Sequence, residues 1–267
     1  MALDVGLQTG LVTGLVQGLG SIYGGYPADG AALAAAMGFA NAPTSYWLFT
    51  ATSGAETDLV NGNTLTPFVG QEPTQGVSDS ALGAITAEFA DASVQRMEAA
   101  NNTVLDITTG DMGIVLVGRY ISGVGGDDDF VTKRTGGQSG YDLYTSSSGR
   151  FVIFQTEDDL GANTNGIIDL GGTGATNLSN GDPFVMVCGV DTNAGTTHVH
   201  IRYQGTTSSN TGSAPASTIT SSQVFTVGGR VSTGNWRIAA LAVWNDDTAQ
   251  GLAGTHAAAL AAFLGFE

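Results

Sequence analysis

Most of the chain is a succession of short segments rich in β-branched and aromatic residues, each bounded by glycine, asparagine, aspartate or serine. The segments that predict strands are Tyr46–Thr50, Phe89–Met97, Ile114–Tyr120, Phe130–Lys133, Tyr141–Tyr144, Arg150–Gln155, Phe184–Val190, Thr197–Tyr203, Val224–Val227 and Trp236–Trp244. The 40 glycines follow no collagen-like period and therefore indicate tight turns. Because strands do not alternate with helices, the pattern excludes a parallel α/β sheet and favours an all-β, antiparallel β-sandwich.

Both ends of the chain depart from this pattern. Glycine–leucine pairs recur every four residues from Gly6 to Leu19, which on a helix forms a glycine ridge beside a leucine ridge. Polar residues interrupt the repeat and no basic residue flanks it, so a membrane span is not expected. We predict an N-terminal assembly arm, helical or extended, over residues 1–42, and the sandwich over residues 43–267. Further helices are predicted at Ala31–Met37 and Gly254–Leu264, and Ser208–Ser222 is expected to be a polar loop.

Charge excludes several classes of partner. The chain has 24 acidic and 8 basic residues, for a formal net charge of −16. Nucleic-acid binding requires a basic surface, so it is not expected, and neither is attraction to an anionic membrane. The first basic residue is Arg96, so no positively charged region of a secretory signal precedes an apolar stretch.

From Tyr46 to Leu264 the order of segments resembles the laminin-G-like jelly roll of the concanavalin-A-like superfamily. The resemblance rests on YWLFTATSGAETDLVNGNTLTP, EFADASVQRMEAANNTVLDITTGDMGIVLVGRY, FVTKRTGGQSGYDLYTSSSGRFVIF, PFVMVCGVDTNAGTTHVHIRYQG and WRIAALAVWNDDTAQGLAGTHAAALAAFL. The chain departs from the family pattern at Phe184, where tryptophan is common, and at Gly189, inside a core strand. The resemblance implies a jelly roll with no fixed catalytic set, so function must be argued from the site.

The sequence gives little support for a catalytic motif. Related jelly rolls that hydrolyse glycans carry a Glu-x-Asp-x-x-Glu strand, which aligns carboxylates across the scissile bond. That spacing is absent, and Glu88 and Asp91, three residues apart, are expected on opposite strand faces. No catalytic residue and no required cofactor are predicted, and we expect the chain not to be an enzyme.

Other reactive residues have structural interpretations. His198 and His200 share one strand face, but a metal site needs further ligands, so we interpret them as solvent-facing strand residues. Cys188 lies in an apolar run and is expected to be a buried, unreactive thiol. The tryptophans, Trp47, Trp236 and Trp244, lie in apolar strands and are expected in the core.

Compact acidic runs provide the candidate metal site. Asp127, Asp128 and Asp129 follow a Gly-Gly turn and precede a strand, and such carboxylates can supply the oxygen ligands that calcium prefers. Glu157, Asp158 and Asp159 form a second run, and a solvated acidic loop is the alternative for both.

The function favoured by these observations is non-enzymatic display. A display fold with no secretion signal and with a small-residue arm predicts a phage virion component: a capsid decoration, fibre or tail protein, assembled in the host cytoplasm and exposed on the virion surface. Its partners are expected to be other copies of the chain or virion structural proteins. The alternative is a lectin-like module that binds surface glycans with or without calcium, and a glycan-degrading enzyme is a third, less favoured hypothesis.

Overall fold

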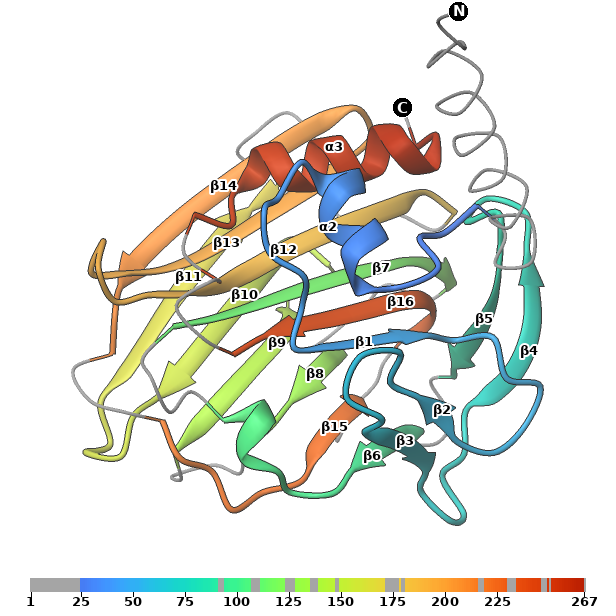
Figure 1. Ribbon diagram of the computed structural model, residues 1–267, viewed down its shortest axis with the longest axis horizontal. Helices are drawn as coiled ribbons and strands as arrows, with labels where there is room; N and C mark the ends of the chain where they lie inside the picture. The colour runs from blue at the N-terminus through green and yellow to red at the C-terminus, as the bar shows by residue number, and fades with distance from the viewer. Residues whose placement is uncertain are drawn as a thin grey trace, which may run out of the picture.

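The part of the chain that the structure describes consists of two antiparallel sheets packed face to face, with two α-helices on the outer face of one sheet (Figure 1). The computed structural model describes residues 25–90, 94–106, 111–122, 128–134, 139–146, 149–170, 178, 181–215, 219–229, 234–245, 249 and 251–266. The predicted all-β sandwich with a C-terminal helix is confirmed.

The first sheet has the strand order β14-β13-β12-β7-β16-β5-β4, and β1 also pairs with β16. Its strands are β1 (Ser45–Leu48), β4 (Thr74–Asp79), β5 (Ala84–Phe89), β7 (Met112–Ser122), β12 (Pro183–Asp191), β13 (Thr196–Tyr203), β14 (Thr206–Ser213) and β16 (Asn235–Trp244). The central strands β7, β12 and β16 are almost continuously apolar because both of their faces are covered.

The second sheet has the order β11-β10-β9-β8-β15-β6-β3-β2. Its strands are β2 (Glu56–Thr57), β3 (Thr64–Pro67), β6 (Arg96–Ala99), β8 (Asp128–Thr132), β9 (Gly140–Ser146), β10 (Phe151–Glu157), β11 (Asn163–Asp169) and β15 (Phe225–Gly228), and a short 3-10 helix, η2, spans Thr103–Leu105. β11 alternates between more exposed and buried residues over most of its length, which is typical of a sheet with one buried face.

Aromatic rings fill the space between the sheets. Phe89 stacks on Trp236 with ring centroids 4.5 Å apart, and Phe130 meets Trp236 edge-on at 4.9 Å. All three tryptophans are buried, as predicted: Trp244 in the apolar cluster on the outer face of the first sheet, and Trp47 and Trp236 between the sheets. Cys188 is also buried there, and burial raises the pKa of its thiol, in agreement with the predicted unreactive state.

The helices α2 (Gly30–Met37) and α3 (Gly254–Leu264) cover the outer face of the first sheet. Leu33 and Met37 of α2 and Leu260 of α3 belong to one apolar cluster with side chains of β7, β12 and β16. Both helices were predicted. The described part of the predicted arm, residues 25–42, therefore packs on the sandwich, and residues 1–24, which carry the glycine–leucine repeat, lie outside the described residues. None of the described helices has the length and hydropathy needed to cross a membrane.

Two predicted boundaries are wrong. The segment Phe89–Met97 is not one strand: β5 ends at Phe89 in the first sheet and β6 begins at Arg96 in the second. The predicted loop Ser208–Ser222 begins inside β14, whose serine and threonine residues tolerate an edge position because most of them face solvent. Polar edge strands lack the apolar signal on which the prediction relied.

Candidate functional site

A partly exposed face of the second sheet is the candidate site: its β11 residues are exposed, its β9 and β10 residues are mostly half-buried, and Ile153 is only 8% exposed. Residues of β9, β10 and β11 that point away from the core form what we call the β9–β11 face: Tyr144, Phe151, Ile153, Gln155, Asn163, Asn165 and Ile167. Their neighbours in the chain, such as Leu143, Phe154 and Ile168, point into the core between the sheets. The helices lie on the other sheet, and α3 contacts β12, β13 and β14.

Side-chain hydrogen bonds order the polar part of this face. The phenol of Tyr144 donates to Oε1 of Gln155 at 3.3 Å, and Nε2 of Gln155 donates to Oδ1 of Asn163 at 3.1 Å. Strand pairing places Asn165 directly opposite Gln155. The result is a fixed group of amides beside a tyrosine ring.

The apolar part of the face lies one step along the strands. Ile153 pairs with Tyr144 on one side and with Ile167 on the other. Phe151 follows, and the guanidinium of Arg150 lies 5.0 Å from the centre of its ring while forming two hydrogen bonds to Asp169, at 2.8 and 2.6 Å. The face thus combines flat apolar surface with hydrogen-bonding groups, the combination that suits sugar rings and other amphipathic ligands.

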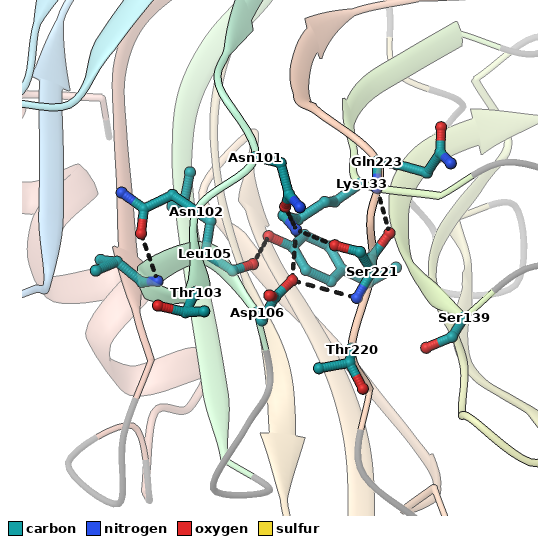
Figure 2. Close-up of polar contacts among 12 residues, drawn as sticks. Asn101, Asn102, Thr103, Leu105, Asp106, Lys133, Ser139, Thr220, Ser221 and Gln223 are labelled. Carbon is teal, nitrogen blue, oxygen red and sulfur yellow. Dashed lines mark hydrogen bonds and ion pairs between the residues drawn. The ribbon is translucent and has the colours of Figure 1, made fainter.

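Lys133, the only lysine in the chain, organises the loops at one end of the sandwich (Figure 2). Its Nζ is buried and donates to Oδ1 of Asn101 at 2.8 Å, to the carbonyl of Ser221 at 2.9 Å and to the carboxylate of Asp106. Asp106 also accepts from the backbone N–H of Ser221 at 3.3 Å. Because these partners saturate the ammonium group, we interpret Lys133 as a clamp between loops and not as a ligand-binding residue.

The predicted calcium ligands are placed only in part. Asp127 lies outside the described residues. Asp128 is buried and accepts from the phenol of Tyr120 at 2.9 Å and from the N–H of Gly234 at 3.1 Å. Asp129 is the next strand residue and faces the opposite side of the sheet. Among the residues that the structure describes, no group of three or more histidine, cysteine or acidic side chains is placed to hold a metal ion. The calcium site stays a prediction.

The second acidic run shapes a turn. Asp158 is buried and accepts from the backbone N–H groups of Leu160 and Ala162, at 3.0 and 2.9 Å, which fixes the connection between β10 and β11. Glu157 is also buried and pairs with Arg134 at 3.2 Å. These two carboxylates are therefore engaged in local structure.

The prediction that His198 and His200 face solvent is wrong. Their side of β13 lies beneath α3, so the two residues are only 5% and 9% exposed. Their rings are 5.2 Å apart, and Nδ1 of His200 lies 2.8 Å from the hydroxyl of Ser209. Burial is the main cause that lowers the pKa of each to about 4.

The carboxylates considered for catalysis do not form a described pair. Glu88 accepts from Nε of Arg237 at 2.7 Å, and Asp91 lies outside the described residues.

The β9–β11 face was not predicted from the sequence. Arg150–Gln155 contains four consecutive apolar residues and NTNGIID contains two adjacent isoleucines, so neither segment shows the polar–apolar alternation that identifies an exposed strand face.

Comparisons with known proteins identify the architecture. No protein-family model matches the chain, and no curated protein sequence matches it. Solved structures do match. The botulinum neurotoxin serotype G binding domain has a TM-score of 0.58 at 11% identity, covering 83% of this chain and 50% of that one. The binding domain of Paraclostridial Mosquitocidal Protein 1 has a TM-score of 0.57 at 13% identity, covering 83% and 51%.

A third neighbour was solved with a sugar. The botulinum neurotoxin serotype D ligand binding domain in complex with N-acetylneuraminic acid has a TM-score of 0.56 at 8% identity, covering 84% of this chain and 50% of that one. The chain therefore spans about half the length of these neighbours. At this identity the likeness shows the fold, a β-sandwich shared with receptor-binding domains, and nothing finer.

Proposed function

We propose that this protein is a non-enzymatic, lectin-like binding module that recognises glycans through the β9–β11 face. The observation that carries the proposal is a tyrosine beside hydrogen-bonded amides on a sheet face that lies away from both described helices. A sugar presents an apolar ring face and a rim of hydroxyls, and this surface offers a partner for each. The fold shared with receptor-binding domains supports this reading.

A glycan array probed with the intact chain tests the proposal. We expect binding to a restricted set of glycans and a loss of about tenfold or more in affinity for Tyr144→Ala or Gln155→Ala, since each removes a direct contact. Asn210→Ala on the exposed edge strand β14 is the matched control and should bind like wild type. No binding to any glycan, or equal binding by all variants, would remove the basis for a lectin.

The same array addresses the calcium prediction. If Asp127, Asp128 and Asp129 hold calcium that supports binding, a chelator should weaken the signal and added calcium should restore it. An unchanged signal would show that glycan binding does not require a bound metal ion.

Placement on a phage particle is a finer proposal, as is a relation to the laminin-G-like family. The first is motivated by the glycine–leucine repeat from Gly6 to Leu19 and predicts self-association through residues 1–24. Light-scattering mass tests it with the full chain and a chain that starts at Gly25, because Tyr26 and α2 already belong to the outer apolar cluster. An oligomer that becomes a monomer on truncation supports an assembly arm, and two monomers contradict it.

A further inference from the structure

A pocket of about 380 Å³ opens where the outer strands of the two sheets approach each other. Three segments line it: Thr52–Gly54 in the loop after β1, Thr66 and Pro67 at the end of β3, and residues Glu72, Pro73 and Gln75 at the start of β4. Its volume falls within the range of small-ligand sites, about 300–1,000 Å³. β3 lies near one edge of the second sheet and β11 forms the other edge, so the pocket is separate from the β9–β11 face.

An irregularity of β4 builds the pocket wall. The pairing of β4 with β5 shifts register between Thr74 and Val77, and β-bulges of this kind re-aim side chains next to binding sites. Gly76, in the bulge, has φ +72°, and a Cβ there would lie 3.0 Å from the Cα of Thr52. Only glycine lets the strand come this close to the loop.

A buried carboxyl group fixes the side chain of Gln75. Nε2 of Gln75 donates to Oε1 of Glu56 at 3.3 Å, and Glu56 also accepts from the N–H of Ala51 at 3.1 Å. Glu56 is only 3% exposed and is therefore a positioning residue behind the pocket wall. The amide of Gln75 is thus held in one orientation before any ligand arrives, which lowers the entropy cost of binding.

The lining selects the chemistry of the ligand. Its polar groups are the hydroxyls of Thr52, Ser53 and Thr66, the Gln75 amide and the Glu72 carboxylate, and its prolines supply rigid apolar surface. A hydrogen bond from the N–H of Gly70 to Glu72, at 2.9 Å, lowers the pKa of that carboxyl group, so it stays ionised at neutral pH. None of the described residues that line the pocket is basic.

We propose that this pocket binds a neutral sugar residue and discriminates against sugars that carry a carboxylate. The pocket is a second sugar site beyond the β9–β11 face, and the inference rests on the proposed glycan binding. Hydroxyls, an amide and a carboxylate can accept from and donate to the hydroxyl rim of a sugar, whereas an anionic sugar would face Glu72 with no basic lining residue to compensate the repulsion. The expected selectivity is therefore opposite to that suggested by a neighbour crystallised with N-acetylneuraminic acid.

The test uses the full chain and an array that presents each glycan core with neutral and with sialylated ends. Ser53→Trp fills the pocket from its exposed rim, and Ser213→Trp places the same bulk on an exposed position of β14 as the matched control. The affinity of the pocket itself is obtained by titrating each glycan and following the amide chemical shifts of Thr52, Thr66 and Gln75. We expect this affinity to favour neutral ends by up to about fivefold at low salt, and to fall about tenfold in Ser53→Trp but not in Ser213→Trp. Amide chemical shifts of Thr52, Thr66 and Gln75 should move when the best neutral glycan is added.

Each contrary outcome has a distinct meaning. Equal or stronger binding of sialylated ends overturns the charge selectivity. If Ser53→Trp binds like Ser213→Trp while Tyr144→Ala loses binding, the pocket is overturned and glycan binding by the β9–β11 face stands. Wild type that binds no glycan at all overturns both proposals.

Discussion

Acid should loosen α3 from the sandwich. All three histidines of the chain lie near this helix: His198 and His200 beneath it and His256 in its first turn. Nδ1 of His256 accepts from the N–H of Ala253 at 2.9 Å, so protonation of that nitrogen removes the side-chain cap of the helix. Nδ1 of His200 lies beside Gly254, so protonation of His200 places positive charge at the N-terminal end of α3, where the helix dipole is also positive, and the ring of His198 lies 5.2 Å from that of His200.

The size of the stability loss at acidic pH follows from the two lowered pKa values. Each falls from 6.5 to about 4 on folding, so the unfolded chain binds more protons between these values, and stability is lost as the pH falls through this window. At about pH 5 the loss is about 2 kcal/mol for each histidine, or about 30-fold in the opening equilibrium. The value of about 4 for His198 already includes the opposing effect of the Asp191 charge, which raises the pKa of that residue.

Hydrogen exchange of residues 254–264 measures this opening directly. Protection factors, which correct for the intrinsic pH dependence of exchange, should fall between about pH 7 and about pH 5, and His198→Leu should remove about 30-fold of that fall. The carboxylates titrate in both proteins, so the difference between wild type and variant isolates the histidine. An identical pH dependence in the two proteins would refute the reasoning.

Three further predictions concern buried polar groups. Lys133→Met should lower the free energy of unfolding by about 3–5 kcal/mol, because it strands the Asp106 carboxylate, and Lys133→Met with Asp106→Leu should regain much of that loss in urea titrations. Glu56→Gln should stabilise the protein by up to about 3 kcal/mol at about pH 8 and little at about pH 5. Burial raises the pKa of Glu56 from 4.5 to about 7, so the ionised Glu56 destabilises the fold increasingly as the pH rises through that range. Thermal melts of wild type and variant at the two pH values check this. Trp236→Phe should cost less stability than Trp47→Phe by about 1 kcal/mol, because Nε1 of Trp47 donates to a backbone carbonyl at 3.0 Å whereas Nε1 of Trp236 has no hydrogen-bond partner among the residues that the structure describes. A smaller cost for Trp47→Phe in denaturant titrations would contradict this ordering.

The sequence predicted those elements in which local composition and burial agree. β7, β12 and β16 are apolar runs that become central strands, and α3 is a run of alanine and leucine that becomes a helix. The polar strand β14 was missed because its stability depends on its neighbour β13, which no local pattern reveals. The same reason applies to His198 and His200: their burial depends on a helix about 55 residues further along the chain.

The candidate site was less predictable than the fold. The pocket arises where β4 meets the loop after β1, and that contact depends on the bulge at Gln75 and Gly76. Pairing register and bulges are set by tertiary packing, so spacing in the sequence does not indicate which hydroxyls and amides converge.

A single lysine that is wholly enclosed gives the chain a built-in reporter. Reagents that acylate side-chain amines can react with Lys133 only when the segments around Asn101, Asp106 and Ser221 have separated. The rate at which this one position is labelled therefore reports how often that end of the sandwich opens. Acylation would in turn trap the opened form, because a neutral amide cannot restore the ion pair with Asp106.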